Sequence, residues 1–184
     1  MAENVSGDSG QVKLAAATTP PASALEVENN TQNTYEDAPV RAEVALFSGP
    51  ADAMGHVLWL MMNSKAHKHM TIADMEWLVA PAIQHGQFMI LKRGEVPIAY
   101  ASWAFLTDDA EQRRLSGNRR MSAADWALGD RAWLVDLVAP FGGAGAVLQS
   151  VKQKFFEDRL LFIEREKSEG VGLEAVEVPG GENI

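Results

Sequence analysis

A strand, a turn and a helix start are combined in the stretch Trp133-Leu134-Val135-Asp136-Leu137-Val138-Ala139-Pro140-Phe141-Gly142-Gly143-Ala144-Gly145. Residues 132–138 are apolar except for Asp136, which predicts a largely buried strand. The glycine-containing segment after it predicts a turn, and residues 146–156 have the composition of a helix. The sequence therefore predicts a strand, a tight turn and a helix in direct succession.

The sequence before this unit predicts two helices and a hairpin. The first helix has apolar residues at i, i+3, i+4, i+7 and i+8, namely Met54, Val57, Leu58, Met61 and Met62. A second helix follows the N-cap Thr71, is kinked or shortened by Pro81 and ends near Gly86. Residues 87–92 and 96–104 then predict two strands joined by a turn at Gly94.

Short helices and two further strands complete the predicted domain. Asp108 with Glu111, and Ser122 with Asp125, have the spacing of capping boxes at the start of short helices. Residues 160–164 and 173–178 predict strands. This order of elements predicts an α+β domain around a central, largely antiparallel sheet.

The first 50 residues differ in composition from the rest of the chain. They are rich in Ala, Thr, Asn, Pro, Ser and acidic residues and have no apolar period, which predicts a disordered tail over residues 1–50. The one compact apolar group there, Val44-Ala45-Leu46-Phe47, can pack on the edge of the domain. Residues 51–184 are predicted to form a single domain, since 184 residues with 47% hydrophobic residues can bury one sizeable core.

The overall composition argues against several classes of function. The chain has no cysteine, which rules out disulfides, thiolate catalysis and cysteine-ligated zinc. Its formal net charge of −9 argues against nucleic-acid binding, which normally relies on a basic surface. No apolar run approaches the roughly 20 residues of a membrane span, and the start lacks the pattern of a secretory signal. We therefore expect a cytoplasmic protein without a membrane span.

His67 and Asp136 stand out as candidates for chemistry. His67 follows the first helix in a polar segment, where it can face a cleft, although an exposed loop histidine has the same pattern. Asp136 interrupts an apolar strand and needs a partner, because an unpaired buried charge is costly. That partner is His67 in one interpretation, and backbone amides or an arginine in the other. The spacing of His67 and His69 gives only weak support for a metal, and no metal is expected.

The glycines of the turn after residues 132–138 are a further candidate site. Gly142, Gly143 and Gly145 lie between a strand and a helix, where backbone amides and a helix N-terminus can bind a phosphate or pyrophosphate. Such a turn can equally serve only to reverse the chain. The full dinucleotide-binding and P-loop patterns are absent.

Motifs spread over residues 54–181 together resemble the RTX toxin-activating lysine acyltransferases. The most specific is Asp136-Leu137-Val138-Ala139-Pro140-Phe141-Gly142. The others are Gly55-His56-Val57-Leu58-Trp59-Leu60, Asn63-Ser64 with His67, Pro81-Ala82-Ile83, Pro97-Ile98-Ala99-Tyr100, Ser102-Trp103-Ala104, Asp125-Trp126, Gly129-Asp130-Arg131 and Trp133. The long polar N-terminal segment departs from the family, and residues 172–177 match it only loosely.

The resemblance implies a fold, a reaction and two catalytic residues. It implies a GNAT-like fold and transfer of a fatty acyl chain from acyl carrier protein to the ε-amine of internal lysines of an RTX protoxin, which activates the toxin. His67 and Asp136 match the catalytic histidine and aspartate. The donor is then a 4′-phosphopantetheine thioester, and no tightly bound cofactor is expected.

A mechanism follows from these assignments. The acceptor lysine is mostly protonated at neutral pH, so neutral His67 acts as general base while Asp136 orients it or stabilises its protonated form. Direct transfer is favoured over an acyl-enzyme at Ser64, and Ser64 and Asn63 are expected to support His67. A local basic cluster is expected to bind the acidic acyl carrier protein; its candidates are Arg113, Arg114, Arg119, Arg120, Lys152 and Lys154.

Two other functions stay open at this point. One is a GNAT-like acyltransferase that uses acyl-CoA and a different amine. The other is a non-catalytic toxin-binding chaperone in which His67 and Asp136 are structural. The sequence leaves the target lysine, the acyl length and the formation of a homodimer undetermined.

Overall fold

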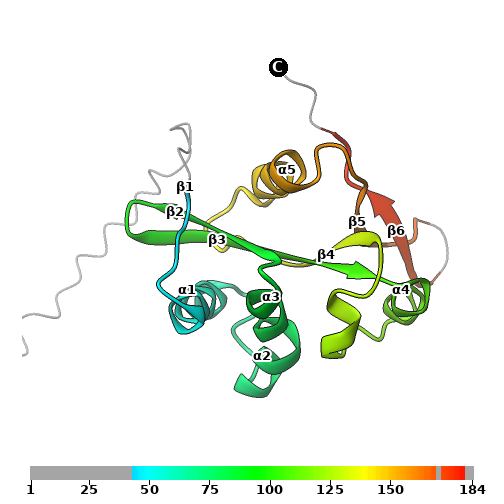
Figure 1. Cartoon of the computed structure of the whole chain (residues 1–184), viewed down its shortest axis with the longest axis horizontal. Coiled ribbons are helices and arrows are strands. Elements are labelled where there is room, and N and C mark those ends of the chain that lie inside the picture. Colours follow the sequence, from blue (N-terminus) through cyan, green and yellow to red (C-terminus); the bar gives the residue numbers. More distant parts are fainter. Residues whose placement is uncertain (1–42, 169–170, 181–184) are drawn as a thin grey trace, which may run out of the picture. The chain divides into compact units, whose positions relative to one another are not determined.

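Six strands form one sheet in the same order as in the chain (Figure 1). The strands are β1 (Glu43–Val44), β2 (Phe88–Arg93), β3 (Val96–Leu106), β4 (Arg131–Val138), β5 (Leu161–Glu166) and β6 (Leu173–Glu177). Neighbouring strands are antiparallel except β4 and β5, which are parallel. This computed structural model describes residues 43–168 and 171–180. The predicted α+β class with a largely antiparallel sheet is confirmed.

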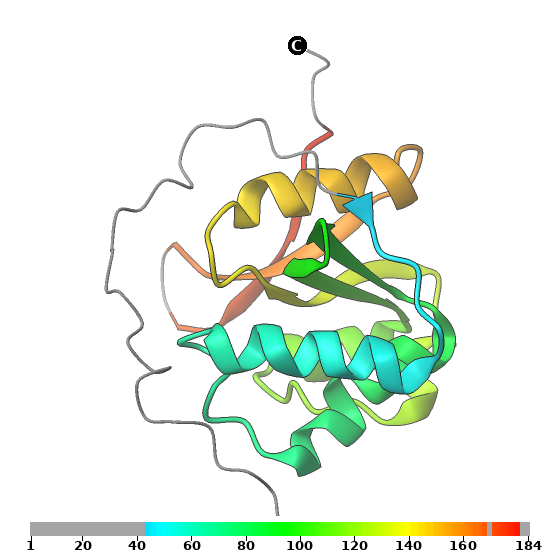
Figure 2. The same cartoon turned by 90° about the vertical axis from the view of Figure 1, so that its left-hand side faces the viewer.

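Helices cover both faces of this sheet (Figure 2). Helix α5 (Ala144–Phe155) connects β4 to β5 and packs on one face through Val147 and Val151. Helices α1 (Pro50–Asn63), α2 (Ile72–Leu78) and α3 (Ala80–His85) lie on the other face, where Val57 and Leu60 pack with Tyr100. Two short elements, α4 (Asp108–Leu115) and the 3-10 helix η2 (Ala123–Trp126), complete that face. The arrangement is consistent with a GNAT-like fold.

Local sequence signals explain most helix boundaries. Thr71 forms a capping box with Asp74 at the start of α2, and Pro81 lies in the first turn of α3, so the predicted second helix is split in two. Gly86 ends α3 in the left-handed conformation with a φ of 64°. The predicted capping box at Asp108 is wrong, because Thr107 is the N-cap of α4 and accepts a hydrogen bond from the Ala110 amide.

The parallel pair β4–β5 is short. In the described residues its register consists of Ala132 opposite Leu161 and Trp133 opposite Phe162, and the remaining part of β4 continues without β5. The chain enters β4 past Gly129, where an added Cβ would overlap the backbone of Leu106. Only glycine therefore lets this loop approach β3 so closely. Because the pairing with β5 ends at Trp133, the sheet opens between β4 and β5 beyond this residue.

The boundary predicted for the N-terminal tail is too late in the chain. Glu43 and Val44 pair with Lys92 and Leu91 of β2. Phe47 packs beside Phe88, with 5.7 Å between the ring centroids. The apolar stretch that ends at Phe47 thus packs on the domain edge, while residues 1–42 of the predicted tail lie outside the described residues.

We expect removal of residues 43–50 to destabilise the domain. A chain that begins at Ala51 loses the β1–β2 pairing and the aromatic contacts of Phe47, which should lower the free energy of unfolding by about 1–3 kcal/mol relative to a chain that begins at Glu43. Urea unfolding of the two proteins measures this difference. Equal midpoints with equal slopes would show that β1 contributes nothing.

Candidate active site

A β-bulge in β4 places the carboxylate of the site. Along the β3–β4 pair Ser102 is opposite Asp136, whereas the next residue of β3, Trp103, is opposite Leu134. Val135 is therefore an extra residue in β4 at this point. Bulges of this kind turn the side chains that follow them to the other face of the sheet.

The bulge decides which face Asp136 occupies. Leu134 and Leu137 both pack on the α5 side, and Val135 packs on the opposite side. Strand residues alternate between faces, so Asp136, which precedes Leu137, shares the face of Val135. Asp136 therefore points to the side of the sheet that carries α1, α2 and α3.

His67 approaches Asp136 from the loop after α1. The buried Ser64 ends this helix, and its carbonyl oxygen accepts hydrogen bonds from the amides of His67 and Lys68 at 3.2 and 2.9 Å. These bonds form a tight turn over residues 65–69. The turn directs the imidazole toward the sheet, while the side chains of Lys65 and Lys68 are exposed.

Three side chains form a continuous hydrogen-bonded series. His67 Nε2 lies 3.0 Å from Asp136 Oδ1, and His67 Nδ1 lies 2.7 Å from Ser64 Oγ. The Leu137 amide also donates to Asp136 Oδ1 at 2.9 Å, which holds the carboxylate in place. An ionised carboxylate only accepts, so Nε2 carries a proton and the Ser64 hydroxyl donates to Nδ1. The lone pair of Nδ1 is thus the basic site of this imidazole.

The surroundings of His67 favour its charged form. The hydrogen bond with Asp136 raises the pKa of His67, burial opposes the rise, and the negative charge of Asp136 adds to it. Both side chains are mostly buried, with 11% of His67 and 12% of Asp136 exposed. Asp136 can therefore stabilise an imidazolium that forms when Nδ1 accepts a proton.

Two hydroxyl residues near Asp136 were missed in the sequence interpretation. Ser102 and Tyr100 are completely buried on β3, on the same sheet face as Asp136. Ser102 interrupts an apolar strand just as Asp136 does, and this was the available signal. Its significance depends on the register between β3 and β4, which local sequence does not reveal.

The glycine turn leads directly from β4 into α5. Gly142 and Gly143 have φ values of 93° and 76°, and Gly143 is the N-cap of α5 without a side-chain hydrogen bond to the helix. The amides at the start of α5 thus have no side-chain cap. Phe141 of this turn packs against Trp59 of α1, with 5.7 Å between ring centroids, and both rings are partly exposed.

Comparison with known proteins identifies the family of this chain. Residues 49–177 match the model of the RTX toxin acyltransferase family, which is more than half of the chain. The chain belongs to the RTX toxin acyltransferase family. The resemblance that the motifs indicated is thereby confirmed.

Several members of this family are similar in sequence. A protein-lysine myristoyltransferase HlyC of Escherichia coli is 39% identical over 106 residues, which are 58% of this chain and 62% of that protein. Another Escherichia coli protein of that name is 36% identical over 123 residues, 67% of this chain and 71% of that protein. The RTX-III toxin-activating lysine-acyltransferase ApxIIC of Actinobacillus pleuropneumoniae is 38% identical over 102 residues, 55% and 59% of the two chains. The chain thus spans between 59% and 71% of the length of these relatives.

Two of the basic residues predicted to contact a donor protein are buried. Arg114 is 4% exposed, and its Nε lies 3.0 Å from Oε2 of Glu164. Lys152 is 6% exposed and donates to the Phe156 carbonyl oxygen at 2.8 Å. The predictions for Arg114 and Lys152 are therefore wrong, because a buried cation held by internal acceptors cannot reach a docking partner.

The other predicted basic residues differ in their availability. Arg113 is bound to Asp109 and Asp125, and Arg119 is bound to Glu164. The side chains of Arg120 and Lys154 are exposed. The side chains of Lys65 and Lys68 are also exposed, so the loop over residues 65–69 carries accessible positive charge beside the candidate pair.

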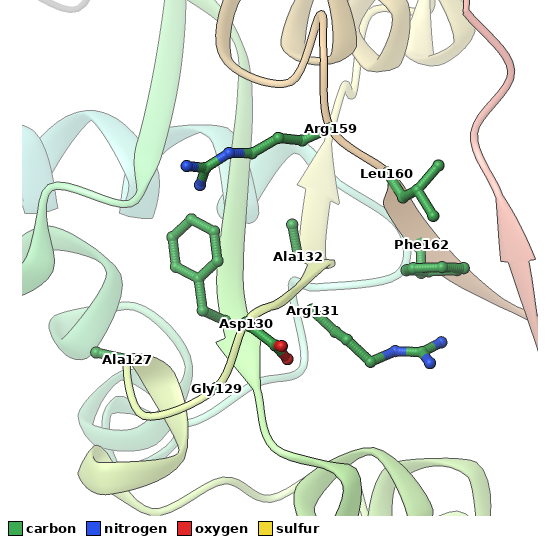
Figure 3. Close-up of a pocket in the computed structure, with 9 residues that line it drawn as sticks. Ala127, Gly129, Asp130, Arg131, Ala132, Arg159, Leu160 and Phe162 are labelled. Carbon is green, nitrogen blue, oxygen red and sulfur yellow. The ribbon is translucent and has the colours of Figure 1, made fainter.

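A pocket of about 620 Å³ lies at the start of β4 (Figure 3). Phe105, Ala132 and Phe162 line it together with Arg131 and Arg159. None of the residues that line it is His67, Ser64 or Asp136. We therefore place the site at the His67–Asp136 contact, because the chemistry of the side chains is more specific than the size of a cavity.

Residues 43–168 and 171–180 show neither a metal-binding cluster nor a membrane-spanning helix. No group of three or more His, Asp or Glu side chains in these ranges is arranged to hold a metal ion. No helix in them is long and apolar enough to cross a membrane.

We expect the imidazole of His67 to titrate above its ordinary pKa of about 6.5. Asp136→Asn removes the negative charge and should lower this pKa. NMR titration of imidazole-labelled protein measures both values.

A raised folded pKa means that the charged pair stabilises the fold fully below about pH 6.5 and that this contribution is lost as the pH rises through the folded pKa. The stability difference between wild type and Asp136→Asn should decrease over that range, and an identical His67 titration in both proteins would contradict the assignment.

Proposed function

We propose that this protein is a protein-lysine acyltransferase that transfers a fatty acyl chain from acyl carrier protein to the ε-amine of internal lysines of an RTX protoxin. Membership of the RTX toxin acyltransferase family supports the reaction class. The observation that carries the proposal is the 3.0 Å contact between His67 and Asp136, residues that lie 69 positions apart in the chain.

The catalytic pair supplies a base for the acceptor amine. A lysine ammonium must lose a proton before or as it attacks a thioester, and its pKa is about 10.4 in a model peptide. In the proposed reaction, the Ser64 hydroxyl passes its proton to Nδ1 of His67 as it takes one from the lysine amine. The neutral amine, whose ammonium proton has gone to solvent, forms the amide bond while the carbon–sulfur bond of the thioester breaks, and the imidazolium returns its proton to the departing phosphopantetheine thiolate. Asp136 stabilises the imidazolium formed in this step.

The thioester is proposed to reach His67 from the turn between β4 and α5. The uncapped amides at the start of α5 favour a phosphate group of the donor, and the positive φ values of Gly142 and Gly143 shape this turn. Gly145 lies in the first turn of the same helix. The exposed Lys65 and Lys68 supply positive charge for the acidic surface of acyl carrier protein.

A covalent route through Ser64 is a second candidate. The 2.7 Å contact between Ser64 Oγ and His67 Nδ1 is also the arrangement that activates a serine nucleophile. In that route the hydroxyl oxygen attacks the thioester, and an acyl-serine then transfers its chain to lysine. Direct transfer needs one step fewer, because a positioned amine can attack the thioester itself.

We expect His67→Ala to fold and to lose acyl transfer by about 10²–10⁴-fold, the usual cost of removing a general base. The assay is mass spectrometry of the lysines of an RTX protoxin after incubation with acyl-acyl carrier protein, and acyl-CoA in a parallel reaction tests the donor. His69→Ala is the matched control, because His69 lies on the same loop and is exposed. Normal acylation by folded His67→Ala would refute the catalytic role and favour a toxin-binding chaperone.

Ser64→Ala separates the two routes. With direct transfer we expect a loss of about tenfold or less, since water can replace a hydroxyl that only relays a proton. With the covalent route the loss should equal that of His67→Ala. Wild-type enzyme incubated with donor alone should keep its intact mass, and a stable increase by one acyl chain that is absent in Ser64→Ala would establish the acyl-serine instead.

A further inference from the structure

Three buried oxygen atoms behind the catalytic pair lack a partner among the described residues. They are Asp136 Oδ2, Ser102 Oγ and the Tyr100 hydroxyl oxygen. One is a carboxylate oxygen, which only accepts hydrogen bonds, and the other two carry a proton to donate. A buried carboxylate oxygen without a donor is costly, and so is a buried hydroxyl without an acceptor. A hydrogen bond from a hydroxyl to the carboxylate oxygen would satisfy both groups.

The sheet register brings these groups together. Ser102 and Asp136 are directly opposite each other across the β3–β4 pair. Such residues have Cβ atoms roughly 4.5–5.5 Å apart, a span that a serine hydroxyl and a carboxylate can bridge by rotation of their side chains. Tyr100 lies two residues before Ser102 on the same face. Burial raises the pKa of Tyr100, and the nearby negative charge of Asp136 adds to this rise.

We propose that Ser102 is a positioning residue, whose hydroxyl donates a hydrogen bond to Asp136 Oδ2 and thereby holds Oδ1 against His67. In this arrangement the Tyr100 hydroxyl lies on the side of the Ser102 hydroxyl that faces away from Asp136. This inference rests on the proposed function, because it concerns how the carboxylate of the catalytic pair is oriented.

The contacts of Asp136 explain why such a residue is needed. Its Oδ1 serves both the Leu137 amide and His67 Nε2. Because both contacts use the same oxygen, they restrain rotation about the Cβ–Cγ bond less than hydrogen bonds to both oxygens would. A donor at Oδ2 fixes that rotation. The bulge at Val135 then determines on which face of the sheet the Asp136 carboxylate lies. The hydroxyl of Ser102 determines how the plane of that carboxylate is oriented.

The test is a double-mutant cycle on single-turnover acyl transfer. Ser102→Ala should lower the rate about tenfold in the wild-type background, which is the scale of one hydrogen bond to a charged group. In an Asp136→Asn background the same change should have less than about a twofold effect, because the charged acceptor is already gone. Ser150→Ala is the matched control: its hydroxyl bonds to the Ala146 carbonyl oxygen on α5, on the other face of the sheet.

A second measurement excludes a general packing effect. NMR titration of His67 should give a lower pKa in Ser102→Ala than in wild type, and an unchanged pKa in Ser150→Ala. The inference is overturned if the His67 pKa is unchanged in Ser102→Ala, or if Ser102→Ala lowers the rate equally in both backgrounds or not at all. A wild-type rate in Asp136→Asn would instead overturn the proposed function itself, so the two failures are distinguishable.

Discussion

The extra residue at Val135 is the constraint on which the candidate site depends. Without it, strict alternation along β4 would turn Asp136 toward α5, on the opposite side of the sheet from His67. The bulge interrupts the β3–β4 ladder for one residue. In return it places a carboxylate on the face where the loop after α1 delivers an imidazole. The candidate site thus depends on the strand register as well as on the identity of its residues.

The opening of the sheet beyond Trp133 has a compensating network of ion pairs. Because β4 and β5 pair over two positions, other contacts must hold β5 in place. Arg114 of α4 binds Glu164 of β5 at 3.0 Å, and Glu111 of α4 accepts from Trp133 Nε1 at 3.1 Å. Burial lowers the pKa of Arg114, and the charge of Glu164 opposes this. Helix α4 therefore contacts both parallel strands through polar side chains. Its buried Arg114 takes part in this internal ion pairing and is not available for docking.

The residues of the candidate site come from three segments that are held in place in different ways. Asp136 belongs to a central strand that is paired with β3 along its length. His67 lies on a loop tied to the end of α1 by hydrogen bonds to the Ser64 carbonyl oxygen. The glycine turn before α5 provides uncapped amides close to the end of the same strand. A carboxylate on a central strand can thus orient a histidine that lies on a surface loop.

Short-range patterns in the sequence predicted most of the elements, and the family resemblance singled out the candidate pair. Apolar spacing predicted α1, Pro81 and Gly86 marked the division and end of the next helical segment, and the anomalous charge at Asp136 marked the strand of the site. The tertiary structure decided the 3.0 Å contact with His67, the hydrogen bonds at its two ring nitrogens, the burial of Arg114 and the placement of Ser102 opposite Asp136. Propensity and periodicity act within a few residues, whereas register, bulges and burial depend on strands that are distant in the chain.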